Sequence, residues 1–216
     1  MSFATQQTVA VVDCGTGNLR SVAQALRLAA QDLRVRVLVT ADAAQLRGAH
    51  RVVLPGQGAM HHSMQALQAG GLLEAVLDAA ASKPLLGVCV GMQMLLDHSA
   101  EGRDAAGTPV VRFELAGRRA PDGSRYKVPH MGWNRVQPTR AHPVWGSLAE
   151  APWFYFVHSY HACPRDPTHC VGEAEHGVRF AAAIARDNLF AVQFHPEKSA
   201  AQGLALYRNF LHWEPG

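Results

Sequence analysis

Apolar residues recur along this chain in two alternating patterns. Short continuous apolar runs occupy residues 8–13, 35–40 and 51–55, and segments with a different spacing separate them. In residues 18–30 the spacing is helical, and the apolar stripe consists of Leu19, Val22, Ala23, Leu26 and Ala30. A short apolar run is typical of a strand buried on both faces. The alternation therefore predicts parallel strands separated by helices.

This alternation continues to the middle of the chain and then changes. We predict a helix at 71–82 after a Gly70-Gly71 break, a buried strand at 83–88, and a helix that starts near 92–96. From Pro109 onward the pattern is one of short strands and turns. The predicted strands are 110–115, 154–159, 170–174, 180–186 and 189–194, and a closing helix is predicted at 202–212.

Together these patterns predict an α/β fold with a doubly wound, mostly parallel sheet, flanking helices and added antiparallel strands in the C-terminal half. A chain of 216 residues that is 48% hydrophobic can bury one substantial core. We expect a single domain over residues 1–216, with its core at about 8–212. The segment 101–108 contains two glycines and is the expected mobile surface loop.

Composition and charge argue against several classes of protein. The formal net charge is only +3 and the basic residues are scattered, which does not favour nucleic-acid binding. Residues 1–7 lack the apolar core of a signal peptide, and no apolar run has the length of a membrane span. The four cysteines follow neither a zinc spacing nor a secreted disulfide framework. We therefore expect a cytoplasmic enzyme without a metal.

One cysteine stands in a distinctive setting, Gly87-Val88-Cys89-Val90-Gly91, between a predicted strand and a predicted helix. Glycines two residues on either side of a nucleophile at such a turn form the nucleophile-elbow pattern. Glycine is needed because a Cβ would crowd the strained turn. Cys89 would then lie at a helix N-terminus, where unpaired N–H groups favour the reactive thiolate. The alternative for an isolated cysteine is a buried apolar position.

A histidine and a glutamate follow the last predicted strand, in the order His195-Pro196-Glu197. Residues two apart in an extended chain point to the same side, and we expect Pro196 to hold the backbone extended. His195 can then take the thiol proton of Cys89 while Glu197 orients the imidazole. Alone, these residues would be a surface histidine and a solvated charge. Together with Cys89 they indicate a catalytic triad.

Six segments, at 11–19, 54–59, 87–93, 127–134, 156–160 and 193–199, carry a resemblance that extends over nearly the whole chain. They resemble class I, triad-type glutamine amidotransferases. The sequences Val-Pro-His-Met-Gly-Trp-Asn at 128–134 and His-Ser-Tyr at 158–160 are similar, more closely, to those of the glutaminase subunits of imidazole glycerol phosphate synthases. Glutaminase subunits of other class I amidotransferases, stand-alone Cys hydrolases and inactive scaffold subunits are the alternatives. An inactive scaffold is expected to lack a triad residue, and this chain has all three.

The resemblance implies hydrolysis of glutamine to glutamate and ammonia without a cofactor. The tetrahedral intermediate needs oxyanion donors, and the backbone N–H of Val90, next to the nucleophile, is one candidate. The loop at 55–58 resembles the family's oxyanion loop and would supply a second donor around Gly56 and Gln57. Its glycines suggest a loop that switches between two arrangements. The alternative is a plain turn after a strand.

Substrate contacts are carried over by position. Gln93 resembles the residue beside the glutamine carboxamide, Glu101 the carboxylate that holds the α-ammonium, and Ser159 and Tyr160 the segment that holds the α-carboxylate. The alternatives are solvated residues for Gln93 and Glu101 and a core aromatic for Tyr160.

The chain departs from the family pattern at four positions, which are Cys14, Gln57, Met60 and Val90. Val90 would act through its backbone, so this change leaves the oxyanion argument intact, whereas Gln57 changes the loop that would have to move. The adjacent His61 and His62 seldom share a face, and no carboxylate or cysteine accompanies them. We interpret them as surface residues rather than a metal site.

The resemblance also implies a partner, because the chain ends soon after Glu197 and leaves no room for an ammonia-accepting domain. The implied partner is the (β/α)8 cyclase subunit of imidazole glycerol phosphate synthase, in a heterodimer. This subunit makes imidazole glycerol phosphate and aminoimidazole carboxamide ribotide in histidine biosynthesis. By analogy Asn18, Trp133 and Asn134 would lie nearest to it. The alternative for Trp133 is a half-buried core position.

Overall fold

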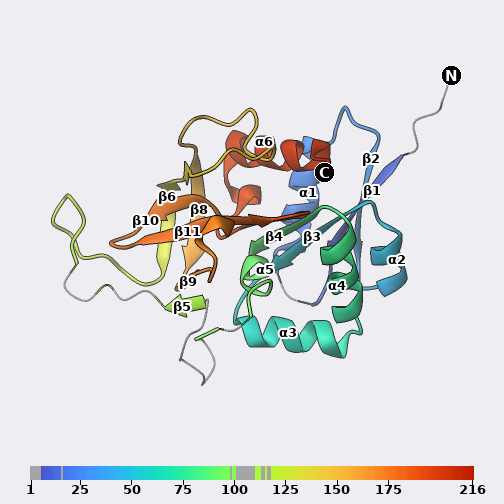
Figure 1. Cartoon of the computed structure of the whole chain (residues 1–216), viewed down its shortest axis with the longest axis horizontal. Coiled ribbons are helices and arrows are strands. Elements are labelled where there is room, and N and C mark those ends of the chain that lie inside the picture. The colour runs from blue at the N-terminus through green and yellow to red at the C-terminus, as the bar shows by residue number, and fades with distance from the viewer. Residues whose placement is uncertain (1–5, 16, 98, 101–109, 113–114, 116–117) are drawn as a thin grey trace.

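The computed structural model of this chain describes residues 6–15, 17–97, 99–100, 110–112, 115 and 118–216. Its main sheet has the strand order β2-β1-β3-β4-β12-β11-β10-β7 (Figure 1). Adjacent strands are parallel across the first five, which are β2 (Val35–Thr40), β1 (Gln7–Val12), β3 (Arg51–Gly56), β4 (Leu85–Cys89) and β12 (Leu189–Val192). The predicted parallel sheet is therefore confirmed.

The C-terminal half adds antiparallel strands. The main sheet continues with β11 (Arg179–Arg186), β10 (Cys170–Glu175) and β7 (Gln137–Pro138), while β9 (Tyr160–Ala162) pairs with β11 and with β5 (Val110–Arg112). A separate two-stranded sheet consists of β6 (His130–Arg135) and β8 (Trp153–His158). These strands confirm the predicted mixed architecture.

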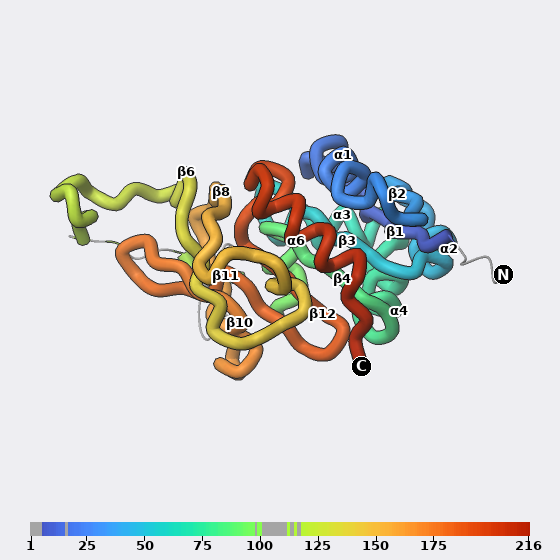
Figure 2. Tube along the Cα trace, turned by 90° about the horizontal axis from the view of Figure 1, so that it is seen from above, coloured from blue at the N-terminus to red at the C-terminus, as the bar shows by residue number. Residues whose placement is uncertain are grey.

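Helices cover both faces of the parallel strands, as Figure 2 shows for α1 (Leu19–Ala29) and α4 (Leu73–Ser82). On one face α1 packs against α6 (Ala200–His212). On the other, α4 packs against α2 (Ala43–Gly48) and α3 (Met60–Ala69). A one-turn helix, α5 (Val90–Gln93), follows β4, and the 3-10 turns are η1 (Pro167–His169) and η2 (Pro196–Lys198).

The core lies between these layers. Every residue of β3 and β4 is buried, which explains why these strands read as continuous apolar runs in the sequence. The predicted stripe of α1 also faces the core, with Val22, Ala23 and Leu26 almost fully buried. Within the described ranges, no helix has the length and apolar character needed to cross a membrane.

Some predicted elements were wrong or were missed. The helix expected to start near 92–96 begins at Val90 and ends at Gln93, because the backbone then tightens into 3-10-type bonds, Leu95 N–H to Met92 and Leu96 N–H to Gln93. The helix predicted at 71–82 begins at Leu73. The sequence pattern predicts neither α2 nor α3, and it marks the residues of β6 only as a motif. The expected mobile loop at 101–108, with Glu101, lies outside the described residues.

Candidate active site

Cys89 is the last residue of β4 and lies immediately before α5. Its backbone adopts φ 55° and ψ −112°, a conformation that is strained for any residue other than glycine. The packing around it leaves no room for side chains. A Cβ on Gly91 would lie 1.8 Å from the carbonyl oxygen of Leu54, and a Cβ on Gly87 would lie 3.0 Å from the Cβ of Ala191. The two flanking glycines therefore let the strained turn close against the neighbouring strands.

His195 reaches the site from the end of β12, and its backbone is fixed to β8. The His195 N–H donates to the carbonyl of Tyr155 at 2.9 Å. The hydroxyl of Ser199 donates to the carbonyl of His195 at 2.6 Å and accepts from the Tyr155 N–H at 3.0 Å. Ser199 is almost fully buried, so this clamp is shielded from solvent. The imidazole is therefore positioned by two sheets at once.

Glu197 holds the imidazole from one side. The Nδ1 atom of His195 lies 2.8 Å from Oε1 of Glu197, and the two side chains are only 9% and 1% exposed. Since a carboxylate only accepts, the proton of this bond belongs to Nδ1. The other ring nitrogen, Nε2, is buried and has no hydrogen-bond partner among the described residues. It is the ring atom available for proton transfer.

The prediction that an extended backbone through Pro196 brings His195 and Glu197 together was wrong. Residues 196–198 do not continue an extended chain but form the 3-10 turn η2, with Pro196 in its first turn and His195 as the extended residue before it. Proline suits this place because its fixed φ is helical and its missing N–H would have no partner there. The tight turn folds the carboxylate of Glu197 back toward the imidazole.

The electrostatics of the pair favour a protonated imidazole. Burial alone would lower the pKa of His195, but contacts with the thiol of Cys89 and the carboxylate of Glu197 outweigh it and raise the pKa from 6.5 to about 9. At neutral pH the ring therefore holds a proton that it can deliver. An acid of this kind beside a thiol is the arrangement that nucleophilic catalysis by cysteine requires.

Two buried amides adjoin the thiol, and the sequence pattern singled out only one of them. Gln193 is fully buried, and its Nε2 lies 3.8 Å from the sulfur of Cys89. Gln93 donates from Nε2 to Oε1 of Gln193 at 3.0 Å and to the carbonyl of Tyr160 at 3.3 Å. The signal that could have found Gln193 is its place two residues before His195, since residues two apart in an extended segment point to the same side.

The loop expected to supply oxyanion donors lies directly against the elbow. Gly56 pairs in register with Cys89, and a Cβ there would be 2.7 Å from the backbone nitrogen of Gly91. Gln57 follows with an exposed side chain, and Gly58 has a positive φ of 80°. Val90 is buried at the first position of α5. The N-terminus of this one-turn helix, whose first N–H groups have no partner within the helix, thus lies beside the sulfur.

A cavity of about 470 Å³ opens above the thiol. Its lining includes Cys89 and His195 together with the predicted substrate residues Gln93, Ser159 and Tyr160. Further lining residues that the sequence pattern did not select are Pro129, Val157, His158 and Lys198. This volume is in the range of small-molecule sites. Glu101, the fourth predicted substrate residue, lies outside the described part of the chain.

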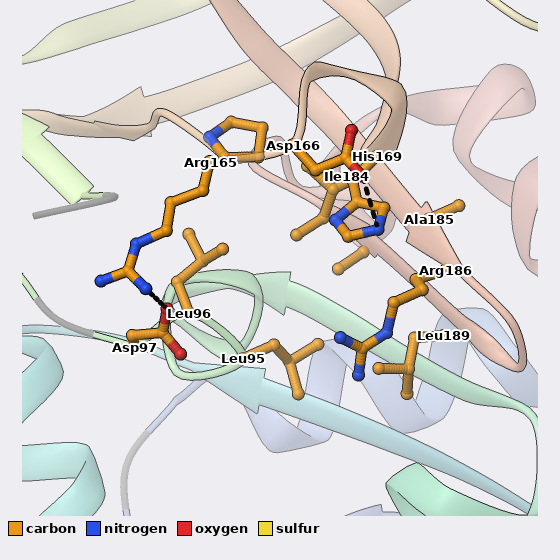
Figure 3. Close-up of a pocket in the computed structure, with 12 residues that line it drawn as sticks. Leu95, Leu96, Asp97, Arg165, Asp166, His169, Ile184, Ala185, Arg186 and Leu189 are labelled. Carbon is orange, nitrogen blue, oxygen red and sulfur yellow. Dashed lines mark ion pairs between the residues drawn. The ribbon is translucent and has the colours of Figure 1, made fainter.

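A second cavity lies apart from this chemistry (Figure 3). Leucines 95, 96 and 189 contribute to its apolar lining, and charged side chains stand around it. Two contacts join these side chains, with Arg165 3.5 Å from Asp97 and His169 3.8 Å from Asp166, whereas Arg186 lies 3.6 Å from Asp187. None of the triad residues is among the described residues that line this cavity.

Histidines 130 and 158 form a buried pair at the cavity wall, of which His158 is part. Nδ1 of His130 lies 2.9 Å from Nε2 of His158, and Nδ1 of His158 lies 2.8 Å from the carbonyl of Tyr160. Burial lowers the pKa of each ring from 6.5 to about 3. Both rings are therefore neutral at physiological pH. They are suited to hold the backbone of Tyr160 rather than to exchange protons in turnover.

The three expected interface residues differ in position. Trp133 is 50% exposed on β6. The amide of Asn134, a partly exposed residue, donates to the carbonyl of Glu175 at 2.8 Å. Asn18 is the residue before α1, and its side chain makes no capping bond.

Comparison with known proteins gives the class first. The family described as "Glutamine amidotransferase class-I" matches residues 10–213. The solved structure of a putative GMP synthase component from Thermoplasma acidophilum has a TM-score of 0.70 at 20% identity, covering 97% of this chain and 94% of that one. A structure described as a glutamine amidotransferase has a TM-score of 0.67 at 15% identity, covering 94% and 97%. These two likenesses establish the fold. The family match shows that the chain belongs to the class I glutamine amidotransferases, which hydrolyse glutamine.

Closer relatives define the family within that class. The imidazole glycerol phosphate synthase subunit HisH of Aromatoleum aromaticum is 51% identical over 211 residues, which are 96% of this chain and 99% of the relative. The subunit of the same name from Dechloromonas aromatica is 52% identical over 213 residues, 97% of this chain and 98% of the relative. At this identity over nearly the full length, the chain is a member of the HisH family.

Proposed function

We propose that this chain is the glutaminase subunit of an imidazole glycerol phosphate synthase, with Cys89 as nucleophile, His195 as base and acid, and Glu197 as orienter. One observation carries the assignment. The buried imidazole is fixed by Glu197 at 2.8 Å through Nδ1, while Nε2 remains unbonded to any described residue and the ring interacts with the thiol at the elbow. This arrangement supplies a nucleophile, a proton carrier and an orienter in one cavity.

Acylation begins when the sulfur of Cys89 attacks the side-chain amide carbon of glutamine. In the resting site the thiol has already given its proton to Nε2 of His195, whose pKa is raised to about 9. The imidazolium passes this proton to the leaving nitrogen, so ammonia departs and a glutamyl thioester remains. Water attacks the thioester while His195 removes its proton. The sulfur then leaves as a thiolate while the proton stays on Nε2, which restores the resting pair as glutamate is released. Glu197 accepts from Nδ1–H in both steps and stabilises the imidazolium.

The oxyanion of each tetrahedral intermediate needs two donors. We assign the first to the backbone N–H of Val90 and the second to the loop at Gly56 and Gln57. The contact between Gly56 and the elbow brings this loop within reach of the sulfur. Glycine at 58, with its positive φ, allows the peptide next to it to rotate at low cost. The loop can therefore present or withdraw its donor.

The cavity accounts for the substrate contacts we propose. Gln93 lies one helical turn from Cys89 and marks the carboxamide end. Ser159 and Tyr160 line the cavity at the position assigned to the α-carboxylate. Glu101 remains the proposed partner of the α-ammonium. The buried bond from His158 to the Tyr160 carbonyl fixes that segment, so the substrate meets a preorganised wall.

An exposed apolar face beside the cavity suits a protein partner. Met131, Trp133 and Trp153 of β6 and β8 are 63%, 50% and 51% exposed. The face adjoins the active site, since Val157 lies opposite Met131 in the β6–β8 pair and also lines the cavity. Large aromatic residues of this kind commonly anchor interfaces.

We therefore propose that the (β/α)8 cyclase subunit docks on this face, forms a heterodimer and receives the ammonia. It would use the ammonia to make imidazole glycerol phosphate and aminoimidazole carboxamide ribotide in histidine biosynthesis. Trp133 is the expected anchor. Asn134 would act indirectly, because its amide is bonded within the chain. Asn18 stands at the start of α1, which packs against η2.

The test separates ammonia release from ammonia use. The chain is combined with its cyclase subunit, and synthesis is followed with glutamine or with ammonium salt as nitrogen donor. Cys89→Ala should abolish glutamine-dependent synthesis and leave ammonium-dependent synthesis intact. The control Cys163→Ala, at an exposed thiol, should retain both. Glutamine-dependent synthesis by a folded Cys89→Ala complex would overturn the assignment.

A further inference from the structure

A tyrosine with no assigned role lies behind the triad. Tyr207, on α6, is 0% exposed. Its hydroxyl is buried and makes no hydrogen bond of regular geometry with any described residue. A buried hydroxyl without a partner is costly, and such groups are rare in native proteins. We therefore expect a hydrogen-bond acceptor close to the hydroxyl of Tyr207.

The acceptor is available on the triad glutamate. Oε1 of Glu197 is occupied by His195, but Oε2 is buried and, within the part of the chain described, makes no hydrogen bond of its own. The carboxylate acts on the phenol directly, since the pKa of Tyr207 is raised well above its ordinary value by burial and then by Glu197. The phenol thus stays protonated, and toward a carboxylate it can only donate.

Close backbone packing holds the two groups together. A Cβ on Gly203 would lie 1.8 Å from the carbonyl oxygen of Pro196, so α6 meets η2 with no side chain between them. Gly203 lies one turn before Tyr207 on the same helix, and Pro196 precedes Glu197. This contact places the phenol-bearing face of α6 behind the carboxylate.

We propose that the hydroxyl of Tyr207 donates a hydrogen bond to Oε2 of Glu197 and is the positioning residue that extends the triad to a fourth, buried member. With Oε1 bonded to His195 and Oε2 to Tyr207, the carboxylate has one orientation. A hydrogen bond to the charged form also keeps a buried carboxylate ionised. Tyr207 acts only through Glu197 and touches neither substrate nor thiol.

The role has a signature in the pH dependence of kcat. Without the phenol, the charged form of Glu197 loses a hydrogen-bond donor, and its stabilisation of the imidazolium weakens first at low pH. The acid limb of the profile should therefore move to higher pH. The titratable groups that share the site, and that must be considered in reading the profile, are Cys89 of β4, His158 of β8, His195, Glu197 and Lys198 around η2, and Tyr207 of α6.

The experiment rests on the proposed glutaminase activity and measures glutamate release with the cyclase subunit present. Tyr207→Phe keeps the ring and removes only the hydroxyl. We expect kcat to fall about ten-fold, the scale of one hydrogen bond to a charged group, with KM unchanged and the acid limb shifted upward. Tyr126→Phe, which removes a phenol far from the triad in the chain, is the matched control and should leave all three quantities unchanged.

A double-mutant cycle separates this role from a structural one. If Tyr207 acts through Glu197, then Tyr207→Phe in a Glu197→Gln background should slow the enzyme no further. Fully additive losses, or an unshifted acid limb in an active Tyr207→Phe enzyme, would overturn the inference. A wild-type complex that releases no glutamate would instead defeat the proposed function itself.

Discussion

At the scale of single residues, the site depends on a backbone that is strained at the nucleophile. Cys89 has a positive φ that few non-glycine residues adopt. His195, in contrast, is held by regular bonds to Tyr155 and Ser199. The strained backbone of Cys89 directs its sulfur into the cavity, and the regular backbone of His195 positions the imidazole beside that sulfur. Glu197 decides which ring nitrogen bears the proton.

The contribution of Glu197 can be measured by Glu197→Gln. The amide preserves shape but cannot stabilise an imidazolium, so kcat should fall by about 10² to 10⁴-fold with little change in KM. Steady-state glutamate release with the cyclase subunit present gives both constants. Glu74→Gln, at an exposed position in the first turn of α4, is the control and should behave like wild type. A Glu197→Gln enzyme within two-fold of wild type would remove Glu197 from the mechanism.

At the scale of elements, the elbow is a three-strand junction. β3 and β12 flank β4 on its two sides, so the turn after Cys89 is confined between their ends. Gly91 touches the backbone of Leu54 at the end of β3, and Gly87 touches Ala191 of β12. The catalytic geometry is thus a product of strand packing rather than of α5, which is a single turn.

Gly91→Ala tests that junction. The added Cβ would lie 1.8 Å from the Leu54 carbonyl, a backbone atom that cannot move aside without shifting β3. We expect the free energy of unfolding to fall by about 3 kcal/mol or more, at the upper end of the cost of overpacking. Denaturant titration measures it. Gly48→Ala adds its Cβ where no atom lies within 4 Å and should leave stability nearly unchanged. Equal stability of the two variants would contradict the close packing at the elbow.

The sequence predicted long, strongly patterned elements and missed weakly patterned ones. The apolar stripe of α1 fits only a helix and the apolar run of β3 fits a buried strand, and the structure contains both elements. In α3 only Met60, Ser63 and Leu67 are buried, a stripe one residue wide that contains a serine. Its amphipathic signal is therefore weak.

Within the site, motif spacing could bring Cys89, His195 and Glu197 into one prediction. The sequence could not give the turn that actually joins the last two. Tyr207 left no signal of function because the role we propose for it arises only when α6 packs behind the triad. Contacts between distant elements of this kind depend on tertiary packing, which no local pattern encodes.

At the scale of the whole molecule, buried histidines couple stability to pH. Burial lowers the pKa of His130 and His158 to about 3 and that of His142 to about 4. The unfolded chain binds these protons near pH 6.5, whereas the folded protein does not. Their contribution to the free energy of unfolding is therefore complete above pH 6.5 and is lost as the pH falls toward 4. The contribution of His195 to stability has the opposite pH dependence, because it is lost as the pH rises through about 9.

We therefore predict that the free energy of unfolding falls on acidification from pH 7 to pH 4. Each buried histidine contributes a slope approaching 1.4 kcal/mol per pH unit, to order of magnitude. Urea denaturation at several pH values measures the slope. His130→Gln should make it shallower, while His62→Gln, at an exposed side chain, should not. A His130→Gln slope equal to that of wild type would contradict the assignment.

We propose that the exposed face and the glycine-containing loop connect partner binding to activity. We expect the isolated chain to hydrolyse glutamine slowly and the complex with bound acceptor to be on the order of 10²-fold faster, because one oxyanion donor has an effect of that size. Glutamate release by the free chain, the complex, and the complex with an acceptor analogue measures this. Trp133→Ala should weaken the stimulation by reducing partner affinity. Full activity of the free chain, unchanged by the partner, would contradict a switching loop.

The most direct test of the central claim is affinity labelling with a diazo-ketone analogue of glutamine, followed by peptide mapping. The analogue must occupy the substrate cavity and meet an activated thiol. Partial desolvation raises the pKa of the thiols of Cys163 and Cys170, which disfavours their reaction. We predict one label per chain, on Cys89, with parallel loss of glutaminase activity and protection by glutamine. Uniform labelling of the four cysteines, or inactivation with Cys89 unmodified, would contradict the triad assignment.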